Sequence, residues 1–115
     1  MVEPQAALTP LAFEILLALA SGEQHGYAIM REVEERSGGS VRAHAGTLYR
    51  AIARLVESGW IEELDAGADA GDDERRRYYR LSALGRRVAS SEAQRLAAQV
   101  QAARRRNLLE RPGLS

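Results

Sequence analysis

The pattern of hydrophobic positions predicts three helices in the first half of the chain, followed by two strands and a further helix. Residues 11–20 contain only one polar side chain, Glu14, so an apolar surface would run nearly all round a helix formed there. Thr9 and Pro10 are typical of its start, as N-cap and first helical residue. Such a helix needs cover on more than one side. Either it lies at the centre of the core, or its outer side, with Phe13 and Leu17, contacts a second copy of the chain.

A second helix is expected at residues 25–37 and a third at residues 44–58. The third has the clearest period, because Leu48, Ile52 and Leu55 fall at i, i+4 and i+7 and form one apolar stripe. Its opposite side carries polar groups: Thr47, Arg50, Arg54 and Glu57. This helix therefore has one face to bury and one face, rich in hydroxyl and guanidinium groups, that is left for solvent or a partner.

Gly59 follows the last periodic residue, where a helix tends to end in a left-handed turn. Two strands of a hairpin are expected next, at residues 60–65 and 75–81, with an acidic loop between them. Glu62 and Glu63 lie across from the second strand and are expected to pair with some of its arginines. Helix, helix, turn, helix and hairpin is the order of a winged helix-turn-helix domain. The fold class expected is therefore mainly α with a small β-hairpin.

The last helix is expected at residues 83–108, about 37–39 Å long at 1.5 Å per residue. A narrow, alanine-rich seam repeats along it at heptad spacing: Ala89, Ala93, Leu96, Val100, Ala103 and Asn107. So long a helix cannot pack along its whole length on so small a domain, so we expect it to pack on another copy of the chain. The parts expected are an arm (1–8), a winged helix-turn-helix domain (9–81), a dimerisation helix (82–108) and a flexible tail (109–115).

The formal net charge is +0, but the charges are strongly segregated. Residues 59–74 hold seven acids and no base, whereas residues 75–95 hold seven Arg and one Glu. All sixteen basic residues are Arg, whose planar guanidinium fits phosphate and guanine better than an ammonium group does. Overall neutrality therefore does not exclude a nucleic-acid partner.

Composition excludes several kinds of chemistry. There is no cysteine, and His25 and His44 are the two histidines. Since no nucleophile–base pair, metal cluster or glycine-rich phosphate loop is visible, we expect no enzyme, no metal and no cofactor. His25 fits a capping role better than a ligand role. No apolar run approaches the roughly 18 residues of a membrane span, and residues 1–8 lack the basic start of a signal peptide. These features predict a cytoplasmic protein without a membrane partner.

The polar face of the third helix allows two interpretations. In the first, it enters the major groove of DNA, where Thr47 and Arg50 contact bases and Arg54 contacts the backbone. In the second, it is an ordinary surface helix. Tyr27, in the first turn of the second helix, could likewise contact a phosphate or pack in a crevice. A protein–protein module with the same fold is the competing class of function, and the neutral net charge and acidic wing favour it slightly.

Short motifs occur in a fixed order over about residues 8–86: Leu8-Thr9-Pro10, His25-Gly26-Tyr27, Val33-Glu34, Ser37-Gly38-Gly39, Gly46-Thr47-Leu48-Tyr49-Arg50, Arg54-Leu55, Gly59-Trp60-Ile61, Arg76-Arg77-Tyr78-Tyr79-Arg80-Leu81 and Gly85. Together they resemble the PadR-like transcriptional regulators, and the short chain is similar to the smaller of the family's subgroups. The resemblance implies a winged-helix homodimer that usually represses transcription on double-stranded DNA, with the C-terminal helix as the dimerisation element.

The resemblance and the residue pattern together nominate two sets of functional residues. Contacts with DNA are expected from Tyr27, Thr47, Tyr49, Arg50, Arg54, Arg76 and Arg77. Contacts in the dimer are expected from Phe13, Leu17, Ala89, Ala93, Leu96, Val100 and Ala103. The resemblance also suggests a small hydrophobic effector. Some relatives hold flat aromatic drugs between tryptophans of the last helix, but this helix has no aromatic residue, and Trp60 is expected in the core.

Overall fold

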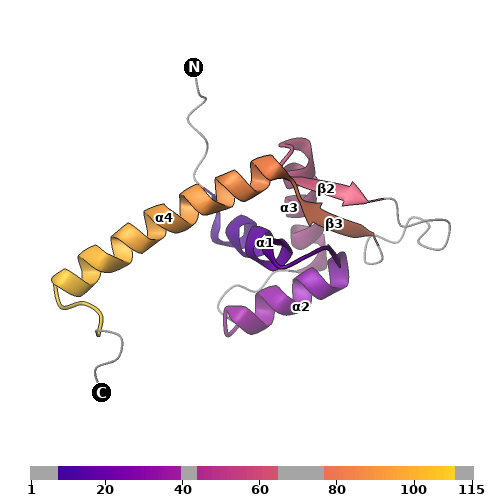
Figure 1. Cartoon of the computed structure of the whole chain (residues 1–115). Coiled ribbons are helices and arrows are strands. Elements are labelled where there is room, and N and C mark those ends of the chain that lie inside the picture. Colours follow the sequence, from indigo (N-terminus) through magenta and orange to yellow (C-terminus); the bar gives the residue numbers. More distant parts are fainter. Residues whose placement is uncertain (1–7, 40–43, 65–76, 111–115) are drawn as a thin grey trace.

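The computed structural model describes residues 8–39, 44–64 and 77–110. This part of the chain forms, in order, α1 (Pro10–Ala20), β1 (Gln24–His25), α2 (Gly26–Arg36), α3 (Ala45–Glu57), β2 (Ile61–Leu64), β3 (Tyr78–Leu81) and α4 (Ala83–Arg105) (Figure 1). The expected fold class, mainly α with a β-hairpin, is confirmed. Residues 1–7, the acidic wing loop and the end of the expected tail lie outside the described residues.

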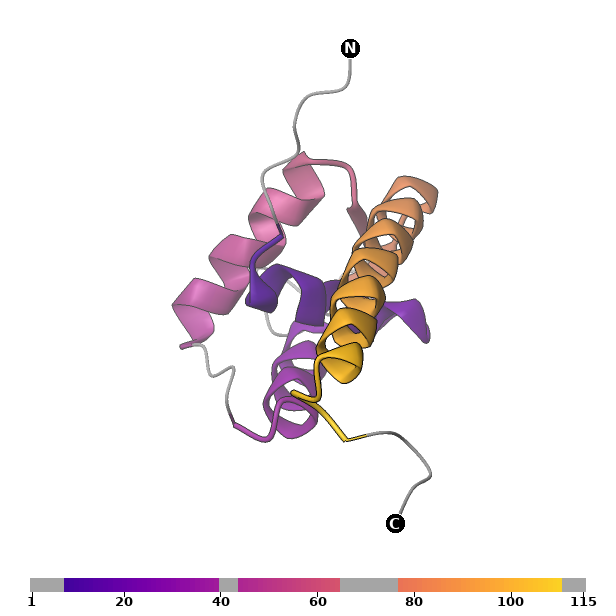
Figure 2. The same ribbon diagram turned by 90° about the vertical axis from the view of Figure 1, so that its left-hand side faces the viewer.

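Helix α1 lies at the centre of the domain. Its buried side chains are Ile15, Leu16, Ala18 and Leu19. It contacts α2, α3, α4 and β3, and Figure 2 shows it between α3 and α4. Thr9 caps it as predicted, because the threonine hydroxyl accepts a hydrogen bond from the Ala12 amide at 3.0 Å. The side of α1 that carries the four buried residues therefore lies at the centre of the core, as one of the two interpretations expected. Phe13 and Leu17, on the other side, are half-buried.

Five other elements contribute buried side chains to the same core as α1. Their buried residues are Ile29 and Val33 of α2, Leu48, Ile52 and Leu55 of α3, Ile61 of β2, Tyr79 of β3 and Val88 of α4. Trp60 is half-buried and packs against this core, as expected from its place between helix and strand. The three-residue apolar stripe predicted for α3 is confirmed in full, since all three of its members are buried.

Helices α3 and α4 each end at a residue in left-handed backbone conformation. Gly59 has φ 78°, and the amide of the next residue, Trp60, donates to the Leu55 carbonyl at 3.0 Å, which is the hydrogen bond of a Schellman turn. α4 ends in the same way, with Asn107 at φ 62° and the Leu108 amide donating to Ala103 at 2.9 Å. The expected end of this helix at residue 108 lies three residues too far along the chain, because α4 ends at Arg105 and Asn107, the last residue of the expected seam, forms the turn that follows it.

The sheet has three antiparallel strands in the order β1-β3-β2. The expected hairpin is β2 and β3, and the short strand β1 joins its other edge through His25, which lies opposite Tyr78. A two-residue strand leaves no alternation in the sequence, so it was not predicted. His25 also caps α2, because its Nδ1 accepts from the Ala28 amide at 3.1 Å, and its ring meets Tyr78 edge to face at 5.5 Å.

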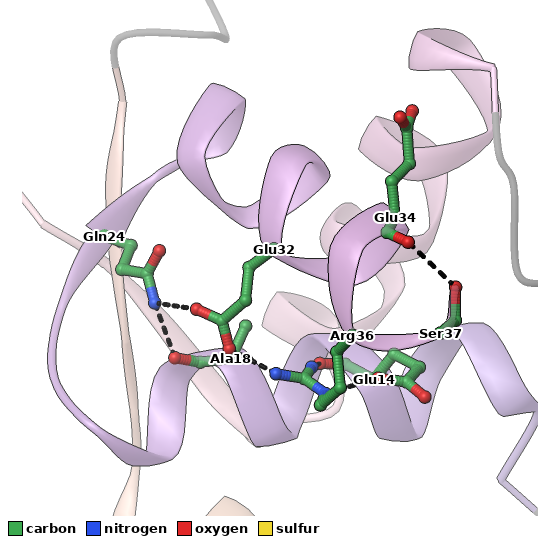
Figure 3. A network of polar contacts seen from close by, with 7 residues as sticks. All are labelled: Glu14, Ala18, Gln24, Glu32, Glu34, Arg36 and Ser37. Atoms are coloured by element: carbon green, nitrogen blue, oxygen red, sulfur yellow. Dashed lines mark hydrogen bonds and ion pairs between the residues drawn. The ribbon is translucent and has the colours of Figure 1, made fainter. Parts of the chain in front are cut away.

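A polar network joins α1 to α2 (Figure 3). Arg36 donates to the Glu14 carboxylate at 2.7 Å and to the Glu14 carbonyl at 2.8 Å, and it also pairs with Glu32. Gln24 donates to Glu32 at 3.0 Å and to the Ala18 carbonyl at 2.6 Å. Although burial opposes the charged form, the hydrogen bonds that Arg36 donates to Glu32 and Glu14 raise the pKa of Arg36 above its ordinary value. The only polar residue of the α1 segment is thus used to orient α2.

Helix α4 leaves the domain from a close contact with the end of α3. Ser82, its N-cap, accepts from the Gly85 amide at 2.9 Å and donates from its hydroxyl to the Gly59 carbonyl at 2.5 Å. The Ser82 amide donates to the Trp60 carbonyl at 3.0 Å, and a Cβ added to Gly85 would lie 1.8 Å from that same oxygen. The first turns of α4 pack on the domain through Val88 and Ala89, and its C-terminal part extends away from the body of the domain (Figure 1).

Substituting Gly85 by alanine should destabilise the domain. Gly-to-Ala changes in a helix normally stabilise it by about 1 kcal/mol, but here the new methyl group would collide with the Trp60 backbone. We expect the free energy of unfolding to fall by about 1–3 kcal/mol, as for other overpacked sites. Urea unfolding followed by circular dichroism measures this. Gly46→Ala is the matched control, because its nearest neighbour is the flexible Arg50 side chain at 3.4 Å. Equal gains in both variants would contradict the steric argument.

Removing the α2 cap should also be measurable. His25→Ala deletes the acceptor for the Ala28 amide and is expected to cost about 1 kcal/mol of stability, the usual size of an N-cap. His25→Asn keeps a capping oxygen and should recover most of that loss, although it loses the ring contact with Tyr78. Thermal unfolding of the three proteins at one concentration compares them. A His25→Asn variant no more stable than His25→Ala would mean that ring packing, not capping, is the contribution of His25.

Candidate nucleic-acid interface

The exposed face of α3 is the first part of the candidate interface. Thr47, Arg50 and Arg54 are all exposed, on the side opposite the buried leucine and isoleucine stripe. The Arg50 guanidinium points back along the helix, with Nη2 3.4 Å from the hydroxyl of Thr47. The structure therefore brings together the two residues expected to contact bases, in a position where a duplex could reach both.

The N-terminal end of α3 carries small, exposed residues within the part of the chain that the structure describes. His44 is its N-cap residue, but the imidazole makes no capping hydrogen bond. Ala45 and Gly46, the first two helical residues, are exposed and small. An uncapped helix start leaves backbone N–H groups facing outward, and these groups attract phosphate oxygens. This end of α3 can therefore lie against a polyanion without steric obstruction from its own side chains.

The two tyrosines expected near the DNA backbone differ in accessibility. Tyr27, in the first turn of α2, is 43% exposed, and the guanidinium carbon of Arg31 lies 6.0 Å from its ring centre. This is a cation–π arrangement that holds a positive charge beside the tyrosine. Tyr49 is half-buried and packs against the core, so most of its ring belongs to the fold. Tyr27 is thus the better placed of the two to meet a ligand.

The wing carries ion pairs across its strands, as expected. Arg80 lies opposite Glu62 in the β2–β3 register and donates to its carboxylate at 2.8 Å. Arg77 lies 3.7 Å from the Glu63 carboxylate. The hydrogen bond and charge of Glu62 raise the pKa of Arg80 above its ordinary value, and Glu23 adds a smaller effect in the same direction. Arg76, the other wing residue expected to contact DNA, lies outside the described residues.

The residues expected in the dimer interface lie on α1 and along α4. Ala89, Leu96 and Ala103 are half-buried on α4, whereas Ala93 and Val100 are exposed, Val100 by 38%. On the same helix, an ion pair joins Glu92 and Arg95 at 2.5 Å, and the hydrogen bond from Arg95 lowers the pKa of Glu92. Beyond its first turns, α4 therefore presents an apolar seam bordered by charged side chains.

The described residues show neither a metal-binding cluster nor a membrane-spanning helix. Across the described ranges, His, Asp and Glu side chains do not gather in any group of three that could hold a metal ion. Within those ranges, no helix combines the length and the apolar character needed to cross a bilayer.

The sequence pattern did not reveal β1 or the contact of Gly85 with Trp60, because both depend on which segments meet in space.

Comparison with known sequences matches residues 15–91 to the Transcriptional regulator PadR-like family. The chain is 32% identical over 76 residues to "Uncharacterized protein X" of Lysinibacillus sphaericus, a match that covers 66% of this chain and 68% of that protein. It is 36% identical over 83 residues to an "Uncharacterized 37.1 kDa protein in transposon TN4556" of Streptomyces fradiae. That match covers 72% of this chain but spans only 22% of the longer protein.

Solved structures share the fold. A PadR family transcription regulator from Clostridium difficile superposes with a TM-score of 0.69 at 23% identity, covering 84% of this chain and 97% of that one. A transcriptional regulator from Clostridium thermocellum gives 0.67 at 22% identity, covering 91% and 97%. RosR of H. salinarum gives 0.65 at 26% identity, covering 81% and 77%. The family consists of transcriptional regulators rather than enzymes. With its helix order, wing and matched residues accounted for, this chain belongs to the PadR-like family of transcriptional regulators.

Proposed function

We propose that this protein is a sequence-specific DNA-binding repressor that acts as a homodimer. The observation that carries the proposal is the exposed polar face of α3, where Thr47 and Arg50 lie 3.4 Å apart next to the small, exposed residues Ala45 and Gly46. An arginine can bond two acceptors on a guanine edge at once, and a threonine can contact either the bases or the thymine methyl group. Membership of a family of transcriptional regulators supports the same conclusion.

Each candidate residue has its own role in this proposal. Arg50 and Thr47 read base edges in the major groove, while Arg54 and Tyr27 hold the sugar–phosphate backbone. On the wing, Arg77 contributes a phosphate contact after leaving Glu63, and Arg76 is proposed for the same task from the sequence alone. Tyr49 supports the helix mainly from inside, where it packs on the core. Contacts with chromosomal DNA would place the protein in the cytoplasm.

The proposed dimer uses the seam of α4 and the half-buried side of α1. Alanines at Ala89, Ala93 and Ala103 allow two helices to approach closely, and Leu96 with Val100 supplies apolar surface. Phe13 and Leu17 of one copy would cover part of this seam in the other. Two recognition helices held in this way would enter successive major grooves, roughly 34 Å apart, on a pseudo-palindromic operator.

In this proposal a small hydrophobic effector relieves repression. It would act by changing the spacing of the two recognition helices, and the junction of α1 with the partner's α4 is the apolar place for it. Since α4 carries no aromatic residue, stacking between tryptophans of that helix is not the way it would bind. Titration of the repressor–operator complex with candidate phenolic compounds, followed by anisotropy, tests whether any effector releases DNA.

The competing candidate is a winged-helix module that binds another protein. The observation in its favour is that Arg77 and Arg80 on the wing already face carboxylates, in a chain of net charge +0. One measurement distinguishes the two candidates. Fluorescence anisotropy gives the affinity of the protein for DNA from immediately upstream of its own gene and for scrambled DNA as the control. Both affinities are measured over a range of salt concentrations. Tight, selective binding with a steep negative salt slope supports the repressor. No salt-dependent binding to any DNA, including a random-sequence pool, supports the module.

Arg50→Ala should weaken operator binding and relax its specificity. Loss of a two-point contact with a guanine is expected to cost about 1–3 kcal/mol and to reduce preference at one base position. Anisotropy on the operator and on single-base variants of it measures both effects. Arg105→Ala is the matched control, since Arg105 is an exposed arginine near the far end of α4. If both variants lose the same affinity, or if Arg50→Ala keeps full affinity and preference, α3 is not the reading helix.

Val100→Glu should convert the dimer to a monomer without unfolding it. Val100 is 38% exposed in the single chain, so a carboxylate there is tolerated by the fold but would have to lose its water in the seam of the dimer. Analytical ultracentrifugation is expected to show at least a tenfold weaker association, corresponding to about 1.4 kcal/mol or more. Gln101→Glu adds the same charge one position away, on an exposed residue outside the seam. A dimer equally weakened by Gln101→Glu would reject the seam as the interface.

A further inference from the structure

The described arginines of the wing already have carboxylate partners, and this has a functional meaning. Resting on the proposed DNA binding, we propose that Glu62 and Glu63 limit the affinity of the protein for DNA. They do so by holding Arg80 and Arg77, so that a phosphate must displace a carboxylate before it can bind the wing. The two glutamates are then affinity-setting residues that suppress binding to DNA of any sequence, while α3 supplies the sequence preference.

The Glu62–Arg80 pair carries most of the argument. The two residues are direct partners in the β2–β3 register, and Arg80 Nε donates to Glu62 Oε1 at 2.8 Å. Their side chains are 50% and 55% exposed, so both can be reached by an incoming phosphate. A phosphate oxygen and a carboxylate oxygen need the same guanidinium N–H groups, and one arginine fork cannot serve both fully. Binding at Arg80 is therefore a competition between them.

The Glu63–Arg77 pair is a looser version of the same arrangement. Its closest atoms are 3.7 Å apart, beyond ordinary hydrogen-bond distance, and the side chains are 45% and 33% exposed. The Glu63 carboxylate therefore opposes a phosphate mainly by repelling its negative charge, and only to a small extent by competing for the N–H groups of Arg77. Glu63 is therefore expected to have the smaller effect of the two.

The fold does not account for these pairs. Exposed ion pairs between flexible side chains contribute little to stability, because water screens them and both side chains lose freedom. The Arg36 network differs, since it also binds the Glu14 backbone and joins α1 to α2. On the wing, a neutral polar residue opposite Arg80 would satisfy the sheet as well as Glu62 does. What the carboxylate adds is a competitor for phosphate.

Glu62→Gln tests the proposal, with a nonspecific duplex as the probe. The amide keeps the size of the side chain but removes its charge, which releases Arg80 for one further phosphate contact. We expect nonspecific binding at about 0.1 M salt to tighten roughly five- to tenfold, and the slope of log K against log salt to become more negative by about 0.9. Glu63→Gln should change both quantities in the same direction but by less.

Two further variants distinguish the effect of the Glu62–Arg80 pair from the effect of changing the net charge of the protein. Glu34→Gln makes the same change of net charge at an exposed residue of α2 outside the wing, and it should alter affinity less than twofold because of screening over a Debye length of about 10 Å. Combining Glu62→Gln with Arg80→Gln should abolish the gain, since the released arginine is then absent. This double variant forms a cycle that isolates the coupling between the two residues.

The results distinguish the wing proposal from the DNA-binding proposal. If the unsubstituted protein shows no salt-dependent binding to any duplex, the DNA function fails and the wing proposal fails with it. If it binds but Glu62→Gln leaves affinity and slope unchanged, only the wing proposal is overturned. The wing proposal is overturned in the same way if Glu34→Gln gains as much affinity as Glu62→Gln, or if the gain survives the loss of Arg80.

Discussion

Burial of α1 inside a shell of other elements is the constraint on which the rest of the structure depends. Because this helix has almost no polar surface, every neighbour must present an apolar face to it, and α2, α3, α4 and β3 all do. That requirement leaves α3 with one free face, and this free face holds the candidate DNA contacts. Glu14, the one charged residue of α1, is used for orientation through Arg36. The position of the interface thus follows from covering a single helix.

Local signals predicted most of the fold. Thr9 and Gly59 marked helix boundaries because capping and left-handed turns depend on residues close in sequence, and the buried stripe of α3 depended only on helical period. Features that depend on tertiary contact were not predicted. Strand β1 is two residues long and exists only because β3 passes beside it. The end of α4 was placed too late, since nothing in the apolar seam distinguishes Asn107 as the turn residue.

For the candidate site, too, the positions of residues could be predicted from the sequence, whereas the directions of individual side chains could not. Which residues of α3 are exposed followed from the period, and pairing of wing arginines with Glu62 and Glu63 followed from their places on facing strands. The degree of burial of Tyr49 did not follow, because a residue at the edge of an apolar stripe can turn either way. Nor did the sequence indicate that the Arg50 side chain would point back to Thr47, which is a choice of rotamer rather than of position.

The contact between Gly85 and Trp60 fixes the direction in which α4 leaves the domain. This contact is with a backbone carbonyl only one residue beyond the turn that ends α3, so the direction of α4 is set by atoms next to the end of α3. At about 1.5 Å per residue, α4 is roughly 34 Å long, and a tilt of about 5° at this contact would move its far end by roughly 3 Å. Successive bases on a strand are about 3.4 Å apart. In the proposed dimer, the close packing that Gly85 allows against Trp60 would therefore set the separation of the two α3 helices to within about one base pair.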